Sequence, residues 1–189
     1  MLPLATTSSI NKGSAMSSLE ADVKATIRNI PDFPKPGILF KDITPILSDA
    51  SLMRRITDSI VQEFSDKGID VVIGMESRGF IFGVPVAMEL GAAFVPARKP
   101  GKLPYDRIGV DYDLEYGSAR LEIHTDAIEA GQKVLIVDDL LATGGTAKAT
   151  VQLAEMLGGE VVSCVFVVEL SFLGGRSLLT SDSYSIATF

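Results

Sequence analysis

The segment 134–146, Val-Leu-Ile-Val-Asp-Asp-Leu-Leu-Ala-Thr-Gly-Gly-Thr, constrains the fold of this chain more than any other. Its first four residues form an apolar run with the length and composition of an interior strand of a parallel sheet. Asp138 and Asp139 follow that run. Ligands of open α/β sheets bind beyond the carboxyl ends of such strands. The segment therefore predicts an α/β fold with a binding site at the end of this strand.

The loop after the acidic pair has the residue types of a sugar-phosphate site. Gly144 and Gly145 allow backbone N–H groups to approach a phosphate closely, and Thr143 and Thr146 add hydroxyl donors. A carboxylate accepts hydrogen bonds, which suits the vicinal hydroxyls of a ribose. An acidic pair after a strand is also common in solvated turns and helix caps. Two acids, two glycines and two threonines within residues 138–146 favour the ribose 5-phosphate interpretation.

A helix is predicted directly after this loop, because apolar residues recur there at helical spacing and Gly158-Gly159 ends the pattern. The residues with this spacing are Ala147, Val151, Ala154 and Leu157. The free N–H groups and the positive dipole end of such a helix favour a bound phosphate. One short segment thus predicts both halves of a ribose 5-phosphate pocket.

Helical and strand-like patterns alternate along the chain. Helices are expected over 17–29, from Leu52 to Gly68 and over 80–90, and Pro85 is expected to begin the last of these. Strands are expected over 69–74, 92–97, 134–140 and 161–170. Residues 112–125 alternate between polar and apolar side chains and are expected to form strands that cross or flank the sheet, and 183–189 an edge strand. The predicted fold is α/β: a doubly wound, mainly parallel sheet with helices on both faces.

Length and composition favour one domain. A chain of 189 residues with 47% hydrophobic content can bury a sizeable core, and we expect a single domain over 19–189. Residues 1–18 are rich in Ser and Thr but lack arginine, so a disordered extension, or an alternative start at Met16, is expected rather than a targeting peptide. The apolar runs have the length of strands, and no transmembrane helix is predicted.

Charge and rare residues exclude several classes of function. A formal net charge of −7 argues against a nucleic-acid surface, although local basic groups can still bind a small anion. Cys164, the one cysteine, lies in an apolar strand pattern and is expected to be a buried core thiol in a reducing compartment such as the cytoplasm. His124, the one histidine, lies in alternating strand sequence and is assigned no catalytic role.

Several further motifs extend this interpretation to a family. They are Pro31-Asp32-Phe33-Pro34-Lys35-Pro36-Gly37, Phe40-Lys41-Asp42-Ile43-Thr44-Pro45, Glu76-Ser77-Arg78-Gly79-Phe80, Arg98-Lys99-Pro100-Gly101-Lys102-Leu103-Pro104 and Leu114-Glu115-Tyr116-Gly117. In this order, and together with segment 134–146, they resemble the type I phosphoribosyltransferases, and among them the enzymes that act on adenine. The resemblance covers about residues 20–175. It implies a small hood, a flexible lid loop, and transfer of a phosphoribosyl group from 5-phosphoribosyl 1-diphosphate to adenine, with AMP and diphosphate as products.

The resemblance also implies roles for individual residues. Ribose and the 5-phosphate would bind Asp138, Asp139, Ala142, Thr143, Gly144, Gly145 and Thr146. Diphosphate would bind Arg78, Arg98, Lys99 and Lys102, with 98–113 as the lid and Tyr116 near its hinge. Mg²⁺ would be held through ligand oxygens and water, without a direct protein ligand. The implied assembly is a homodimer, with no nucleic-acid or membrane partner.

Glu115 is the acid-base candidate, since by resemblance its carboxyl group approaches the imidazole edge of the base. Leu39, Phe40, Lys41 and Leu140 are the expected base-binding residues. Lys41 leaves a different purine base as an alternative, because enzymes for 6-oxopurines often have a lysine near the base. A further alternative is a non-catalytic regulator that senses phosphoribosyl diphosphate, although the chain has no appended DNA-binding region.

Overall fold

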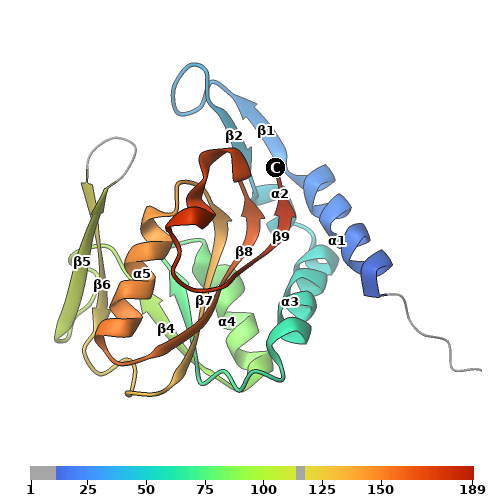
Figure 1. Cartoon of the computed structure of the whole chain (residues 1–189). Coiled ribbons are helices and arrows are strands. Elements are labelled where there is room, and N and C mark those ends of the chain that lie inside the picture. The colour runs from blue at the N-terminus through green and yellow to red at the C-terminus, as the bar shows by residue number, and fades with distance from the viewer. Residues whose placement is uncertain (1–11, 114–117) are drawn as a thin grey trace, which may run out of the picture.

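The computed structural model describes residues 12–113 and 118–189, and its centre is a five-stranded parallel sheet (Figure 1). The strand order is β4-β3-β7-β8-β9, and every neighbouring pair is parallel. The strands are β3 (Val71–Met75), β4 (Ala93–Ala97), β7 (Lys133–Leu141), β8 (Glu160–Glu169) and β9 (Ser183–Thr188). The predicted α/β class and parallel sheet are confirmed.

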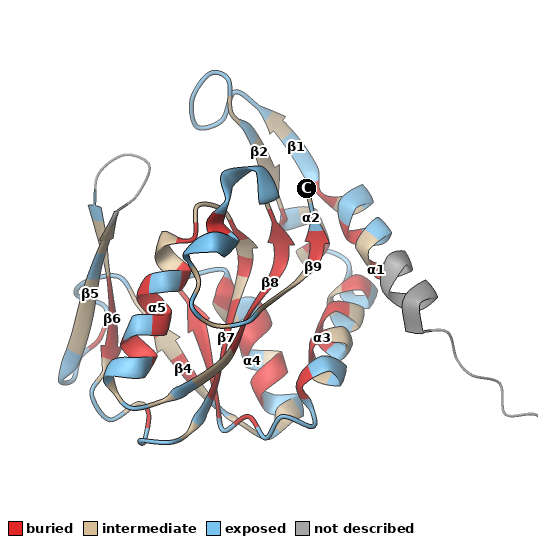
Figure 2. Cartoon of the chain, viewed as in Figure 1, coloured by how far each residue is buried: buried red, intermediate tan, exposed pale blue. Residues whose placement is uncertain are grey.

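Helices cover both faces of the sheet, as a doubly wound fold requires. The helices are α1 (Lys12–Thr26), α2 (Thr44–Leu47), α3 (Ala50–Phe64), α4 (Gly79–Leu90) and α5 (Gly145–Met156). One core cluster contains side chains of α1, α2, α3 and α4, which pack with strand residues such as Leu135 and Val137 of β7. The other joins α5 and the hairpin of β5 (Arg107–Asp113) and β6 (Ser118–His124) with Val134 and Ile136. Buried residues therefore fill both layers (Figure 2).

Two small antiparallel units flank the sheet. One is the β5–β6 hairpin, which is not part of the main sheet. The other is the hood, β1 (Arg28–Pro31) paired with β2 (Leu39–Asp42). They lie on opposite sides of the sheet, near the end at which residues 142–146 follow β7 (Figure 1). The flanking strands and the hood predicted from sequence are both present.

The boundaries of several elements differ from the sequence prediction. The first helix ends at Thr26 rather than Asn29, because residues 28–31 are extended and pair with β2. Pro85 does not begin a helix: α4 starts at Gly79 and continues through it. The C-terminal part of the expected lid is strand β5, which pairs with β6 from Arg107 onward. In each case tertiary pairing or packing overrides a local signal from proline or glycine.

Helix ends follow their local chemistry. The Asp49 carboxylate caps α3 by accepting hydrogen bonds from the backbone N–H groups of Ser51 and Leu52, both at 3.0 Å. Gly91 ends α4 in the left-handed conformation, with φ 67°. None of the helices in the described ranges has both the length and the apolarity needed to cross a bilayer.

The strand order creates a crevice in the middle of the sheet. β3 and β7 are neighbours, but the chain continues from β3 to β4 on one side and from β7 to β8 on the other. Loops that leave neighbouring strands in opposite directions leave a gap at their carboxyl ends, where ligands of such sheets bind. The segments after β3 and β7 contain Arg78 and the Gly144 loop.

We predict that Cys164 is inert in the folded protein. Its side chain is fully buried in β8, and burial raises the pKa of the thiol to about 11. Since the thiolate is the reacting species, modification by iodoacetamide should be slow in the native protein and fast in denaturing guanidinium. Mass spectrometry that finds native Cys164 modified as quickly as the denatured thiol would contradict this core position.

Candidate active site

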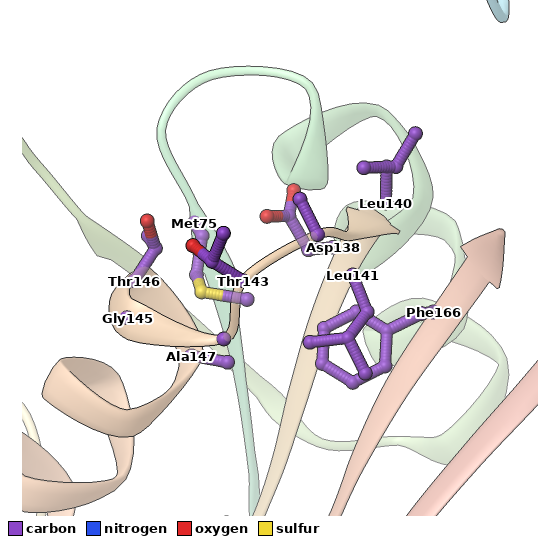
Figure 3. Close-up of a pocket in the computed structure, with 11 residues that line it drawn as sticks. Met75, Asp138, Leu140, Leu141, Thr143, Gly145, Thr146, Ala147 and Phe166 are labelled. Atoms are coloured by element: carbon purple, nitrogen blue, oxygen red, sulfur yellow. The ribbon is translucent and has the colours of Figure 1, made fainter. Parts of the chain in front are cut away.

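A cavity of about 70 Å³, open to solvent, lies where β3, β7 and β8 meet the start of α5 (Figure 3). Its lining residues are Met75, Asp138, Leu140, Leu141, Ala142, Thr143, Gly144, Gly145, Thr146, Ala147 and Phe166. All of the residues predicted to bind ribose and 5-phosphate, except Asp139, thus surround one cavity. Their roles remain predictions, but their spatial convergence is a property of the fold.

The phosphate loop, residues 142–146, leads directly into α5. Gly144 caps the helix with φ 86°, a left-handed conformation that favours glycine, and its carbonyl accepts a hydrogen bond from Lys148 N at 2.9 Å. The first N–H groups of α5 have no intrahelical acceptor and lie at the cavity. The loop therefore offers backbone donors, two threonine hydroxyls and a helix dipole to an anion.

The two carboxylates of the acidic pair occupy different environments. Asp138 lines the cavity, and its Oδ1 accepts a hydrogen bond from Asp139 N at 2.9 Å. Asp139 is buried and accepts a hydrogen bond from Arg78 Nε at 2.6 Å. Arg78 thus binds one carboxylate oxygen of Asp139, and ribose binding by Asp138 and Asp139 stays a prediction. Burial, followed by the neighbouring Asp139 charge, raises the pKa of Asp138.

Arg78 lies at the N-terminus of α4, beside the carboxyl end of β7. Its side chain is 49% exposed although its Asp139 partner is only 4% exposed. The buried carboxylate orients the guanidinium, and the remaining N–H donors stay close to solvent in the crevice. Arg78 and the acidic pair do share one crevice, as the sequence predicted.

A second carboxylate orients the start of the lid. Glu76 accepts hydrogen bonds from Arg98 Nε and Lys99 N, each at 2.9 Å. Burial opposes ionisation of Glu76, but these hydrogen bonds and the Arg98 charge outweigh it and lower its pKa. The Arg98 guanidinium also lies 5.8 Å from the centre of the Phe80 ring. Arg98 therefore lies at the crevice edge, next to the segment that contains Arg78.

The rest of the lid is held by the hairpin. Glu122 of β6 is buried. Its carboxylate accepts a hydrogen bond from Gly101 N at 3.4 Å and forms an ion pair with Arg107 Nε at 3.1 Å. Lys99 and Lys102 are exposed. Glu115 and Tyr116, the acid-base and hinge candidates, lie outside the described residues.

The expected base-binding residues are divided between the hood and β7. Leu39, Phe40 and Lys41 belong to β2, and the Phe40 ring packs edge-on against Phe33 with centroids 5.1 Å apart. Leu140 lines the cavity. The Lys41 ammonium donates to Asn29 Oδ1 at 2.7 Å and lies 4.2 Å from the centre of the Phe189 ring. The Lys41 side chain thus links the hood to Phe189, the residue after β9, and this position gives no support to its use in recognising a 6-oxopurine.

Comparison with known proteins settles the family. Residues 42–182 match the model of the phosphoribosyl transferase domain. A protein of Methylococcus capsulatus named adenine phosphoribosyltransferase is 59% identical over 157 residues, which cover 83% of this chain and 92% of that protein. The chain belongs to the adenine phosphoribosyltransferase family.

Solved structures of the family have the same fold. The adenine phosphoribosyltransferase of Thermoanaerobacter pseudethanolicus is 50% identical, with a TM-score of 0.86 over 89% of this chain and 99% of that chain. The Saccharomyces cerevisiae enzyme, solved with adenine and an imino-altritol bisphosphate, is 41% identical, with a TM-score of 0.85 over 90% of this chain and 99% of that one. The type I phosphoribosyltransferase architecture predicted from sequence is confirmed.

Some residues around the adenine phosphoribosyltransferase cavity were not singled out from sequence. Met75 and Phe166 line it, yet in sequence they are ordinary members of apolar strands. Glu76 lies inside a recognised motif, but its partnership with Arg98 depends on the pairing of β3 with β4. Gly175 contacts the phosphate loop from a distant segment. No periodic signal identifies such contacts, because they arise between elements.

We predict that Gly144→Ala destabilises the protein more than Gly131→Ala. Both glycines have nearly the same left-handed φ, 86° and 85°, so the backbone strain is alike and costs about 1–2 kcal/mol. A Cβ at Gly131 meets no atom within 4 Å, whereas at Gly144 it overlaps the Gly175 carbonyl oxygen. Overpacking should add about 1–3 kcal/mol at Gly144. Equal losses in urea unfolding would contradict the contact.

Proposed function

We propose that this chain catalyses the purine-salvage reaction of adenine with 5-phosphoribosyl 1-diphosphate to give AMP and diphosphate. A bond forms between N9 of adenine and C1′ of the ribose, the bond from C1′ to the diphosphate oxygen breaks, and the N9 proton is released. The observation that carries the proposal is the cavity at the N-terminus of α5, lined by Asp138 and residues 142–146 in a member of this family. The single buried Cys164 suits a reducing compartment, and we place the reaction in the cytoplasm.

The 5-phosphate and the ribose of the substrate are bound by the loop and by Asp138. The N–H groups and hydroxyls of residues 142–146 bind the 5-phosphate, and Asp138 accepts hydrogen bonds from the ribose hydroxyls. Asp139 acts through Arg78, which it orients toward the crevice. Fixing the sugar in this way places C1′ for attack, and positioning of this kind supplies much of the rate in group transfer.

The leaving diphosphate meets basic groups from two segments. Arg78 and Arg98 are already oriented by Asp139 and Glu76, so little reorganisation is needed when negative charge develops on the leaving group. Lys99 and Lys102 join when the lid closes and excludes water. These four residues are the proposed diphosphate site.

Magnesium fits this arrangement as an ion carried by the substrate. In the described part of the chain, no three His, Cys, Asp or Glu side chains gather closely enough to hold a metal ion. The crevice carboxylates of Glu76 and Asp139 bind arginines instead. Mg²⁺ retains water and favours phosphate oxygens, so we propose that substrate oxygens and water hold it. When bound, it offsets the charge of the diphosphate.

Adenine is proposed to lie between the hood and β7. Phe40 and Leu140 supply apolar surface for the flat ring, and backbone groups at Leu39 and Lys41 read its exocyclic amine. The yeast relative was solved with adenine bound, which supports this choice of base. Glu115 is proposed to hydrogen-bond or exchange a proton at the imidazole edge.

Product analysis tests the function. Purified protein should form AMP from adenine, 5-phosphoribosyl 1-diphosphate and Mg²⁺, and should form no comparable product from hypoxanthine or guanine. If product formed with hypoxanthine or guanine but not with adenine, the substrate would be a 6-oxopurine and the proposed base would be wrong. Binding of the diphosphate substrate without product from any purine would favour a sensing protein over an enzyme.

We predict that Glu115→Gln slows the chemical step about a hundredfold, because the amide keeps the shape of the side chain but cannot act as an acid or a base near neutral pH. Single-turnover AMP formation measures this step, and equilibrium titration should find substrate affinity little changed. Glu155→Gln, an exposed glutamate of α5, is the control and should match the parent. If Glu115→Gln keeps the parent rate, the proton is transferred by another group or by water.

A homodimer is the proposed assembly. Ile81, Val84 and Met88 recur at helical spacing along α4 and are 40%, 40% and 76% exposed. This helix lies beside β4, the edge strand of the main sheet. An apolar stripe on a helix next to a sheet edge suits a self-complementary contact between two copies, and two-fold dimers are the commonest closed assembly.

We predict that Met88→Asp converts the dimer to a monomer, because it introduces a charge into the apolar α4 stripe. Met156→Asp, at an exposed methionine of α5 outside this stripe, should leave the dimer intact. Light scattering at matched concentrations distinguishes the two. A dimer that survives Met88→Asp, or a parent protein that is monomeric, would exclude this surface.

A further inference from the structure

The segment that connects β8 to β9 packs against the phosphate loop without lining the cavity. It contains two short 3-10 helices, η1 (Ser171–Leu173) and η2 (Gly175–Leu178). Gly175 is buried at the contact with the loop. No residue of this segment is among those that line the cavity. Its influence on the site must therefore pass through the loop itself.

The contact between Gly175 and the phosphate loop is made by backbone atoms on both sides. A Cβ at Gly175 would overlap the Ala142 carbonyl oxygen and lie 2.8 Å from Gly144 N. A Cβ at Gly144 would overlap the Gly175 carbonyl oxygen and lie 3.0 Å from Gly175 Cα. Because neither side has a flexible side chain at the contact, a displacement of Gly175 must change the packing of the loop.

The residue after Gly175 fixes the segment to the sheet through a network that we name the arginine clamp: Glu169, Arg176, Ser183 and Ser185. Arg176 donates from Nε to Glu169 Oε1 at 3.0 Å and from Nη2 to Glu169 Oε2, which makes a bidentate pair. Its Nη1 donates to Ser183 O at 2.7 Å and Ser183 Oγ at 2.6 Å. Ser185 Oγ lies 3.1 Å from Nη2 and donates to Glu169 Oε2 at 2.7 Å.

The clamp acts at the strand end from which the phosphate loop leaves. Glu169 is the last residue of β8 and pairs with Leu141, the last residue of β7, in the sheet register. The carboxylate is 5% exposed, and its hydrogen bonds with Arg176 lower its pKa against the opposing effect of burial. A buried carboxylate of this kind needs its partner, because an unpaired buried charge is strongly destabilising. Arg176 and Glu169 therefore act as one unit.

We propose that Arg176 is a positioning residue for the 5-phosphate site: through Glu169 and the two β9 serines it holds Gly175 against the Ala142–Gly144 backbone and so keeps the loop N–H groups in register for the phosphate. Arg176 does not touch the substrate. The inference rests on the proposed function, in which this loop binds the 5-phosphate of 5-phosphoribosyl 1-diphosphate.

Arg176→Ala tests the clamp. It should weaken binding of ribose 5-phosphate about tenfold in calorimetry, within the range of about tenfold to a hundredfold found when groups that orient a metal ligand are removed. The KM for 5-phosphoribosyl 1-diphosphate should rise similarly, whereas the KM for adenine should change less than about twofold. A merely structural role would reduce the amount of active protein without this split between the two substrates. Arg54→Ala, which removes an exposed ion pair with Glu89 at 3.2 Å, is the control.

Two more variants keep the test decisive if Arg176→Ala does not fold. Gly175→Ala inserts one methyl group at the contact and leaves the clamp residues in place, so it should also weaken ribose 5-phosphate binding. Arg176→Lys keeps a charge for Glu169 but loses the fork, and should give an intermediate affinity. Parent affinity in folded Gly175→Ala and Arg176→Lys would overturn the clamp alone. A parent protein that binds neither sugar phosphate would overturn the proposed function, and the clamp with it.

Discussion

The parallel pairing of β3 with β7 is the constraint on which the rest of the site depends. It joins Val71–Gly74 to Val134–Val137 in register, with buried side chains on both faces. Because the chain leaves these two strands in opposite directions, their carboxyl ends open into the crevice. Arg78 follows one strand and the phosphate loop follows the other. Backbone hydrogen bonds and apolar packing thus bring together two groups that are far apart in sequence.

Carboxylates with little exposure bind arginines in the crevice and in the adjoining hairpin. Asp139 binds Arg78 and Glu76 binds Arg98 at the crevice, whereas Glu122 binds Arg107 and Arg120 in the hairpin. Each pair joins a carboxylate that is less than 15% exposed to an arginine that remains partly exposed. The carboxylates are therefore best understood as supports that orient cations, and the cations keep donors available for an anionic substrate. Oriented arginines of this kind supply the local positive charge that the proposed diphosphate site needs in a protein with a net charge of −7.

The parallel sheet and the helix after the glycine-hydroxyl loop could be predicted from local patterns, namely an apolar run and helical spacing. The family could be predicted from the resemblance of several motifs to known sequences. Sequence could not separate the environments of Asp138 and Asp139, since the difference depends on Arg78 at the N-terminus of α4. The 6-oxopurine alternative depended on the Lys41 side chain, and sequence could not show that its ammonium contacts Asn29 and Phe189. Gly144 was explained by a ligand, whereas its neighbour Gly175 also excludes a side chain. Each difference comes from a contact between distant segments, which composition and periodicity do not encode.

We propose that the N-terminus of α5 and the preceding loop form the phosphate site. Amide chemical shifts measured by NMR during titration with ribose 5-phosphate test it most directly. We expect saturable shifts concentrated at Thr143, Gly144, Gly145 and Thr146, with little change at Gly131, which lies in the turn before β7. Saturable shifts confined to the β5–β6 hairpin or the hood, with the loop amides unchanged, would contradict it.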